Sequence, residues 1–256
     1  MPKTRPIRLL ALDFDGVIVD SVLECAVVAY NGYQAFQDLD FRIRSPQEIP
    51  AEMLSKFRSM RPFIRSGEDY LYLFQALDEG ITITDQGKFD KFLDAHPARK
   101  ESYYQLFYSE REALMISDHK NWIALNPPYD GMIVSLQSIK PELTLQIVST
   151  KAPQYIWEIL NYNGILLDVE QIHQAGRGSS KSDIVNTILQ ENNLSPEEVV
   201  FIDDHPDTVL KVSETGVVCF LAEWGYNNVE RRHFNMDNDI SVICLTELMG
   251  LLKKWK

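Results

Sequence analysis

Two acidic residues, Asp13 and Asp15, stand one position apart near the start of the chain, with Gly16 behind them and an apolar segment (residues 7–12) before them. Buried carboxylates are unfavourable unless they bind a cation or take part in a reaction. One carboxylate can attack phosphorus to form an aspartyl-phosphate, while the other protonates the leaving oxygen and then activates water. The alternative interpretation is a strand-end turn that is simply acidic.

Other polar side chains follow later apolar segments in the same way. They are Ser149 and Thr150, then Lys181 at the start of a helical pattern behind a glycine-rich loop, then Asp203 and Asp204. In open α/β sheets, ligands bind beyond the carboxyl ends of the strands, and parallel strands place those ends at one edge. Carboxylates, a hydroxyl and a lysine at one edge suit a phosphate group together with Mg²⁺, which prefers oxygen ligands.

Short apolar segments predict the strands that position these residues. They lie at residues 7–12, 143–149, 171–174, 199–202 and 217–221, with a sixth candidate at 240–244. Helical patterns at 153–163 and 180–192 alternate with them, and residues 195–198 predict a single turn. This alternation of strand and helix predicts an α/β fold with a doubly wound parallel sheet.

The interval between the first two predicted strands is far longer than a crossover requires. About 130 residues separate Leu12 from Leu143, whereas a parallel crossover needs a dozen or more. The interval has helical patterns at residues 21–36, 51–60, 68–77, 86–95 and 97–116, and a proline-containing turn at 126–131 ends it. We therefore expect a sheet domain formed by residues 1–20 and 126–256, with a helical domain inserted at residues 21–125.

Composition narrows the class of partner. The chain has 25 Lys plus Arg against 37 Asp plus Glu, a formal net charge of −12, which disfavours nucleic acid and anionic membranes as partners. Its three cysteines show no metal-ligand spacing, which fits a reducing cytoplasm. No apolar segment reaches the roughly 18 residues of a membrane span, and no signal peptide is recognisable. We expect a cytoplasmic monomer or homodimer that acts on a small molecule.

The sequence resembles the haloacid dehalogenase (HAD) superfamily, in particular its phosphatase-type members with a helical cap, such as the phosphoglycolate phosphatase-like and β-phosphoglucomutase-like proteins. Residues 13–17 (DFDGV) resemble the first motif of the family, residues 147–150 (IVST) the second, Lys181 the third and residues 201–204 (FIDD) the fourth. The resemblance implies a Rossmann-like parallel sheet. It also implies that the insertion at residues 21–125 is a cap that closes over the site.

The resemblance implies a role in phosphoryl transfer for each motif residue. Asp13 would be the nucleophile, and Asp15 would be the general acid and base. Ser149 and the backbone of Thr150 would hold phosphoryl oxygens. Lys181 would neutralise Asp13 and the transferred group.

The resemblance also implies Mg²⁺ as the cofactor. Asp204, together with Asp203, would hold the ion along with Asp13 and the carbonyl of Asp15. The next acid, Asp207, lies three residues after Asp204, not four or five as in some relatives. We therefore expect the adjacent pair to supply the ligands.

Several features nearby allow two interpretations. The family's third motif is often Lys-Pro, whereas here serine follows Lys181. Lys151 is therefore a competitor for the role of Lys181. The other interpretation of Lys151 is a solvated lysine at the start of a helix. His205 either lines the rim of the site or caps the next helix. The loop at residues 224–226 (WGY) resembles one in sugar- and glycolate-phosphate phosphatases; it either borders the site or forms a packed aromatic corner.

Arg58, Arg61 and Arg65 form a basic group in the inserted region of this acidic chain. Arginine suits a second anionic group on the substrate, because its guanidinium makes bidentate hydrogen bonds. Salt bridges to neighbouring acids are the alternative interpretation.

Asp15 discriminates among the reactions of the family. Dehalogenases and phosphonate-cleaving members lack an acid at this position, so Asp15 favours a Mg²⁺-dependent phosphatase that hydrolyses a small phosphorylated metabolite through an aspartyl-phosphate. A phosphosugar mutase of the β-phosphoglucomutase type is the alternative. A non-catalytic binding protein that retains the fold is a third hypothesis, and the presence of every acid argues against it.

Overall fold

The computed structural model describes residues 6–176 and 178–255. The chain divides into two compact units, one formed by Met1–Asp20 with Pro128–Lys256 and the other by Ser21–Pro127. We call them the sheet unit and the helical unit. The division expected after residue 125 thus falls after Pro127 in the structure.

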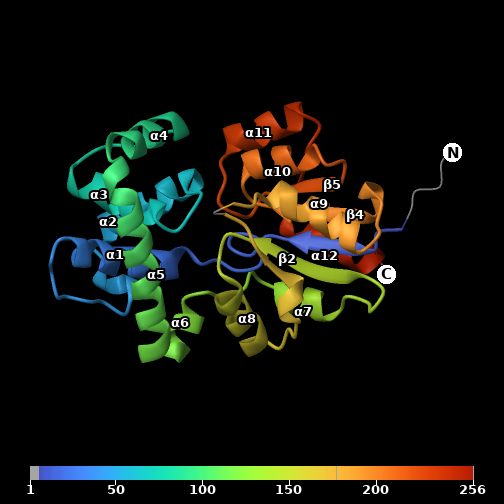
Figure 1. Cartoon of the computed structure of the whole chain (residues 1–256), viewed down its shortest axis with the longest axis horizontal. Helices are drawn as coiled ribbons and strands as arrows, with labels where there is room; N and C mark the ends of the chain where they lie inside the picture. Colours follow the sequence, from blue (N-terminus) through green and yellow to red (C-terminus); the bar gives the residue numbers. More distant parts are fainter. Residues whose placement is uncertain (1–5, 177, 256) are drawn as a thin grey trace. The chain divides into compact units, whose positions relative to one another are not determined.

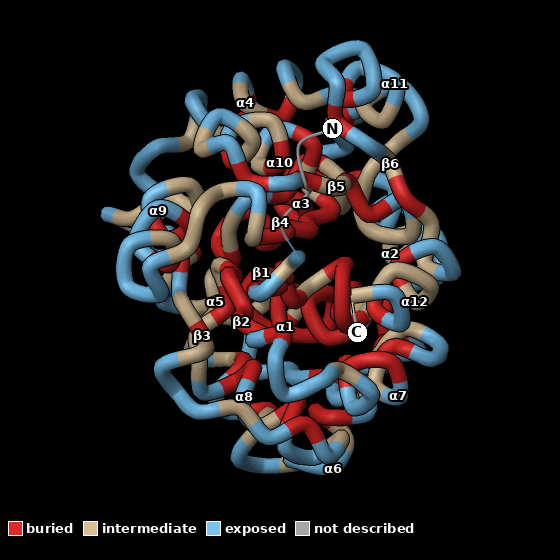
Figure 2. The backbone as a smooth tube through the Cα atoms, turned by 90° about the vertical axis from the view of Figure 1, so that its right-hand side faces the viewer, coloured by how far each residue is buried: buried red, intermediate tan, exposed pale blue. Residues whose placement is uncertain are grey.

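The sheet unit contains, within the described residues, a six-stranded parallel sheet in the order β3-β2-β1-β4-β5-β6. The strands are β1 Leu9–Leu12, β2 Thr144–Ser149, β3 Ile172–Gln174, β4 Val199–Asp203, β5 Val218–Ala222 and β6 Ser241–Ile243. β1 and β4 are buried along their whole lengths (Figure 2), as central strands of a sheet covered on both faces are. The predicted α/β fold with a doubly wound parallel sheet is confirmed.

β1 aligns the carboxyl ends of its two neighbours. Leu12 pairs with Ile147 of β2 on one side and with Ile202 of β4 on the other. The backbone N–H of Asp13 donates to the carbonyl of Ile202 at 2.9 Å, which extends the ladder one residue beyond β1. The residues that follow these strands therefore leave the sheet at the same edge.

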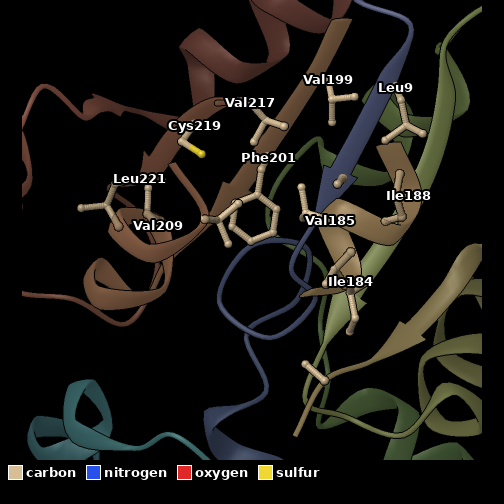
Figure 3. Close-up of a cluster of buried hydrophobic side chains, with 14 of the residues drawn as sticks. Leu9, Ile184, Val185, Ile188, Val199, Phe201, Val209, Val217, Cys219 and Leu221 are labelled. Carbon is tan, nitrogen blue, oxygen red and sulfur yellow. The ribbon is translucent and has the colours of Figure 1, made fainter. Parts of the chain in front are cut away.

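Helices cover both faces of the sheet, with α9 and α10 on one face and α7, α8 and α12 on the other (Figure 1). The helices of this unit are α7 Met132–Gln137, α8 Pro153–Tyr162, α9 Lys181–Glu191, α10 Pro206–Ser213, α11 Val229–Asp237 and α12 Leu245–Lys254. Figure 3 shows the apolar cluster between α9, α10 and the strands, which includes Leu9, Phe201 and Leu221. Burial of this cluster packs α9 and α10 against the sheet.

Local signals explain where these helices begin. Pro153 and Pro206 occupy the first positions of α8 and α10, where the missing N–H has no helical partner to lose. α9 begins with a capping box, in which Ser180 accepts from the N–H of Asp183 and Asp183 accepts from the N–H of Ser180. This cap fixes Lys181 in the first turn. α7, α11 and α12 are helices that the sequence patterns above do not predict; α7 spans only six residues, too few for a helical period to stand out.

The helical unit packs around aromatic side chains. Its helices are α1 Val22–Phe36, α2 Ala51–Met60, α3 Asp69–Asp78, α4 Gln86–Ala95, α5 Lys100–Ser117 and α6 His119–Ala124. The ring of Tyr70 stacks on Phe57 and on Phe107, with centroids 5.7 and 5.4 Å away. The helix predicted at 97–116 is divided, because a 3₁₀ turn at Pro97–Arg99 precedes α5. Within the described residues, no helix combines the length and the apolar character needed to cross a membrane.

A buried ion pair joins α1 to α5. Arg111 donates through Nε and Nη2 to the two carboxylate oxygens of Glu24, both at 2.8 Å. The same carboxylate accepts from the indole of Trp122 at 3.2 Å and from the thiol of Cys25 at 3.5 Å. Burial alone would lower the pKa of Arg111, but Glu24 raises it above its ordinary value. One carboxylate thus meets one guanidinium, and the charges balance.

Candidate active site

Three buried carboxylates gather where β1 and β4 end. Asp13 follows β1, Asp203 is the last residue of β4, and Asp204 follows it. One oxygen of each carboxylate lies within 4.8 Å of the others, and the three residues are only 7%, 0% and 4% exposed. We call these three residues the acidic cluster. The structure thus brings together the acids of the first and fourth motifs.

Lys181 lies between two members of the acidic cluster. Its Nζ is 2.8 Å from Oδ2 of Asp13 and 2.7 Å from Oδ2 of Asp203. Burial raises the pKa of Asp13 to about 6, although Lys181 acts against this effect. Burial alone would lower the pKa of Lys181, but the two carboxylates raise it above its ordinary value. The ammonium group is therefore charged at neutral pH and offsets part of the negative charge.

Ser149 of the second motif also reaches the position of Asp13. It is the last residue of β2 and is 1% exposed. Burial raises the pKa of Asp13, and a hydrogen bond with Ser149 opposes that rise. Thr150 follows in a half-buried bend. The phosphate-binding roles of both residues stay predictions.

The side chain of Asp15 is bound by Lys151 and does not join the acidic cluster. Lys151 Nζ lies 2.8 Å from Oδ1 of Asp15 and 5.4 Å from the ring centroid of Phe14. Lys151 is 2% exposed, so the interpretation of a solvated lysine at a helix start is wrong. The reason is local, because Pro153 begins α8 and leaves Lys151 in the loop before it. The proposed metal ligand on Asp15 is its carbonyl, and that role stays a prediction.

The two residues of uncertain role after the fourth motif lie at the start of α10. His205 is the residue before α10, and its backbone N–H donates to Oδ1 of Asp203 at 2.8 Å. Its Nδ1 lies 3.4 Å from the hydroxyl of Thr208, within the first turn. Asp207 is ion-paired with Arg231 and is not part of the acidic cluster. His205 thus occupies the N-cap position of α10, but its side chain accepts no capping hydrogen bond from the helix backbone, so both interpretations of this residue stay predictions.

The loop after β5 packs against Asp204. The backbone N–H of Tyr226 donates to Oδ2 of Asp204 at 2.5 Å, and Nδ2 of Asn227 donates to its carbonyl at 3.1 Å. A Cβ added to Gly225 would lie 2.2 Å from Cβ of Asp204, so glycine alone fits here. Gly16, at φ +85°, is equally close, because its added Cβ would lie 2.1 Å from Oδ2 of Asp204. Of the two interpretations for this loop, the structure supports the one in which it borders the site.

The three arginines of the helical unit have different surroundings. Arg65 forms a bidentate ion pair with Asp90, with N···O distances of 2.8 and 3.0 Å. The guanidinium of Arg61 lies 5.3 Å from the ring centroid of Tyr70. Arg58 is exposed on α2. The salt-bridge interpretation therefore applies to Arg65, with a partner on α4 in place of the nearer acids.

The acidic cluster has the ligand chemistry of a site for a hard divalent cation. Two of its three carboxylates, those of Asp13 and Asp203, contact the ammonium group of Lys181, so the three acids and this lysine together carry net negative charge when the acids are ionised. Mg²⁺ takes oxygen ligands, often one or two carboxylates, and keeps several waters. The residues present therefore fit Mg²⁺.

Two contacts of the site are missing from the sequence-based interpretation. The pairing of Lys151 with Asp15 was within reach, since a proline two residues later indicates a loop before the helix. The contact of Tyr226 with Asp204 uses a backbone N–H, so no residue type in the sequence indicates it.

Comparison with known proteins agrees with this geometry. The model of the haloacid dehalogenase-like hydrolase family matches residues 7–210. The phosphoglycolate phosphatase of Vibrio parahaemolyticus is 24% identical over 230 residues, and that of Vibrio cholerae is 23% identical over 230 residues, each match covering 88% of both chains. A haloacid dehalogenase-like family protein of Streptococcus pneumoniae has the same fold, with a TM-score of 0.62 at 16% identity over 98% of this chain and 99% of that one. This chain belongs to the haloacid dehalogenase-like hydrolase family.

Proposed function

We propose that this hydrolase is a Mg²⁺-dependent phosphatase that cleaves a small phosphorylated metabolite in the cytoplasm, as a monomer or homodimer. The observation that carries the proposal is the buried acidic cluster with Lys181 between Asp13 and Asp203. The Vibrio relatives, which are named phosphoglycolate phosphatases, support a phosphate ester as the class of substrate.

Asp13 is the proposed nucleophile. One of its carboxylate oxygens forms a bond to phosphorus, and the bond between phosphorus and the leaving oxygen breaks. The backbone N–H of Phe14 holds Oδ1 at 2.7 Å, while Lys181 holds Oδ2 at 2.8 Å. Lys181 also offsets charge on the transferred group, which Ser149 and the backbone of Thr150 bind. These contacts keep the carboxylate oriented, so little reorganisation is required before attack.

Asp15 is the proposed general acid and base. It gives a proton to the leaving oxygen as that bond breaks, and then takes a proton from the attacking water. The water oxygen bonds to phosphorus, the bond from phosphorus to Asp13 breaks, and inorganic phosphate leaves. Lys151, at 2.8 Å, positions the carboxylate of Asp15 throughout.

The acidic cluster, with the carbonyl of Asp15, would hold Mg²⁺. When bound, the ion supplies positive charge that offsets the carboxylates and the phosphoryl oxygens. Backbone N–H groups of His205 and Tyr226 hold the carboxylates of Asp203 and Asp204 in place for that ion, and Asp203 also holds Lys181.

The helical unit is proposed to act as the cap that selects the substrate, since it is inserted directly after the segment that carries Asp13. Arg58 and Arg61 would bind a second anionic group, with Arg65 held by Asp90. Replacing Arg61 by Ala should then raise KM for doubly anionic substrates and leave p-nitrophenyl phosphate nearly unchanged. An equal loss for both would indicate a structural arginine.

A substrate screen tests the proposed function. Purified protein is assayed for phosphate release from a panel of phosphorylated metabolites, with Mg²⁺ and with chelator, beside a haloacid assay and a phosphosugar mutase assay. We expect Mg²⁺-dependent phosphate release from one or a few small esters. Full turnover in chelator, with metal shown to be absent, would contradict the metal site. Turnover in the mutase assay alone would replace hydrolysis by transfer between hydroxyls.

A further inference from the structure

The loop at residues 224–227 touches two different parts of the sheet unit. At one end, the backbone N–H of Tyr226 donates to Oδ2 of Asp204 in the acidic cluster. At the other, the phenol of the same residue donates to Oδ1 of Asp20 at 2.7 Å, and the indole of Trp224 donates to the carbonyl of Val17 at 3.1 Å. One side chain and its own backbone therefore join the acidic cluster to residues 17–20.

The loop at residues 224–227 packs tightly against Gly16 and Asp204. A Cβ on Gly225 would lie 2.5 Å from the carbonyl oxygen of Gly16 as well as 2.2 Å from Asp204. A Cβ on Gly16 would lie 2.8 Å from the ring of Tyr226. Three segments thus meet with no space between them, and interfaces packed this closely transmit small shifts. A change in the position of Asp204 must therefore displace the loop or be resisted by it.

Asp20 is the last residue of the sheet unit before the chain enters the helical unit. The chain returns at Pro128, which forms a bridge with Val19. The N–H of Tyr129 donates to the carbonyl of Ile18 at 3.0 Å. We call residues 17–20 and 128–129, where the chain leaves and re-enters the sheet unit, the two crossing segments. They are bonded to each other by these contacts, and the phenol of Tyr226 is bonded to Asp20 of the first segment.

We propose that Tyr226 is a positioning residue that couples cation binding at the acidic cluster to the conformation of the two crossing segments. The inference rests on the proposed function, because it requires Mg²⁺ at the acidic cluster. With its phenol anchored on Asp20, Tyr226 presents its N–H in one place and pre-orients Asp204, as residues behind metal ligands commonly do. Coupling of this kind is reciprocal, so Mg²⁺ in turn stabilises residues 17–20.

Two variants remove the proposed link from opposite sides, and binding of Mg²⁺ alone is the measurement. Tyr226→Phe deletes only the phenol oxygen, and Asp20→Ala deletes its acceptor. Tyr162→Phe is the matched control, because this tyrosine is 58% exposed on α8. For each protein, MgCl₂ is titrated while the thermal midpoint is followed. Hydrogen exchange of the peptide covering residues 14–21 is measured with and without Mg²⁺.

In the natural protein we expect Mg²⁺ to raise the thermal midpoint and to slow exchange in residues 14–21. Tyr226→Phe and Asp20→Ala should each weaken Mg²⁺ binding about two- to tenfold, the size of one net hydrogen bond, and abolish the slowing of exchange. The double variant should be no weaker than either single variant, because both remove one link. Tyr162→Phe should behave as the natural protein.

Each departure from this pattern identifies what fails. If the natural protein shows no response to Mg²⁺, the metal site and the coupling are both overturned. If it responds but Tyr226→Phe and Asp20→Ala respond equally well, the coupling alone is overturned and the proposed phosphatase stands. Losses that multiply in the double variant would show two independent contacts and would also overturn the coupling.

Discussion

The sheet unit and the helical unit each bury a cluster of charged side chains, but the two clusters differ in charge balance. In the helical unit, Glu24 forms a bidentate ion pair with Arg111, and the same carboxylate also accepts a hydrogen bond from the indole of Trp122. In the sheet unit, Lys181 pairs with Asp13 and Asp203 of the acidic cluster, while Asp204 accepts a hydrogen bond from the backbone N–H of Tyr226. The helical pair is balanced without any ligand, whereas the acidic cluster keeps a surplus of negative charge.

The difference shows that burial of charge alone does not indicate a functional site. A buried pair can be purely structural, since each charge satisfies the other and removing one partner is what destabilises the fold. A buried surplus of one sign is unfavourable in the absence of a counter-charge, so it indicates a position where a cation binds. Charge balance, more than depth of burial, separates the two regions.

The largest expected effect is on turnover by Asp13→Asn. An amide is a poor nucleophile toward phosphorus, so we expect kcat to fall by at least about a thousandfold. Removing one carboxylate also lowers the surplus charge, so the metal-free thermal midpoint should not fall. Steady-state kinetics and thermal unfolding in chelator measure the two effects. A variant that retains most of its activity would show that Asp13 is not the nucleophile.

Glu24→Gln should produce the opposite pattern in the helical unit. It leaves the buried guanidinium of Arg111 without its counter-charge, which should lower the free energy of unfolding by about 3–5 kcal/mol. Urea unfolding measures the loss, and Glu52→Gln, at an exposed pair on α2, is the control with no measurable change expected. If the loss is no larger than that of the control, the helical pair is not structural and the comparison between the regions fails.

Asp15→Asn should lower turnover by about a hundredfold or more, the usual contribution of a general acid and base. With an activated leaving group, phosphoenzyme should still form but should hydrolyse slowly, because only the second step then needs a base. Rapid-quench measurement of phosphoenzyme checks this. Equal losses with activated and ordinary esters in the first step would contradict the acid role.

Mg²⁺ binding should weaken as the pH falls below about 6. Burial raises the pKa of Asp13 to about 6 in the metal-free protein, so below that pH the ion must displace a proton. The apparent affinity should fall by up to about tenfold per pH unit. The folded metal-free protein holds the proton on Asp13 more tightly than the unfolded chain does. The free energy of unfolding of the metal-free protein should therefore decrease as the pH rises from 3.8 towards 6. Titrations at several pH values, with Asp13→Asn as a flatter control, measure both trends.

The smallest expected effect is that of Arg65→Ala. Its pair with Asp90 is more than two-fifths exposed on both sides, so solvent screens it and the loss of stability should be at most about 1 kcal/mol. Urea unfolding beside Glu24→Gln measures the contrast between an exposed and a buried pair. A loss as large as that of the buried pair would contradict the charge-balance argument.

The sequence predicts the centre of the sheet well because β1 and β4 are buried over their whole lengths and β1 is entirely apolar, whereas the edge strand β3 (IHQ) is only partly buried and gives a weaker signal. The acids at the ends of β1 and β4 are predictable for the same reason, since strand ends in a parallel sheet share an edge. The contact of Tyr226 with Asp204 could not be predicted because it uses a backbone N–H, and the partner of its phenol, Asp20, lies 206 residues away in sequence. The pairing of Lys151 with Asp15, 136 residues away, was missed although Pro153 indicates that Lys151 lies in a loop. Contacts between loops of this kind depend on tertiary packing, which no local pattern encodes.

The position of β1 between β2 and β4 also determines the order in which the chain can fold. Residues 9–12 are made first, but their partner on one side begins at Thr144 and on the other at Val199. The helical unit, formed by Ser21–Pro127, is complete in the chain before the first residue of β2 is made. Pairings so distant in sequence close slowly, because a long loop must be ordered before they form. During synthesis, we therefore expect the helical unit to form its core while the apolar β1 still lacks both neighbours, and the acidic cluster to assemble only with the last of these pairings.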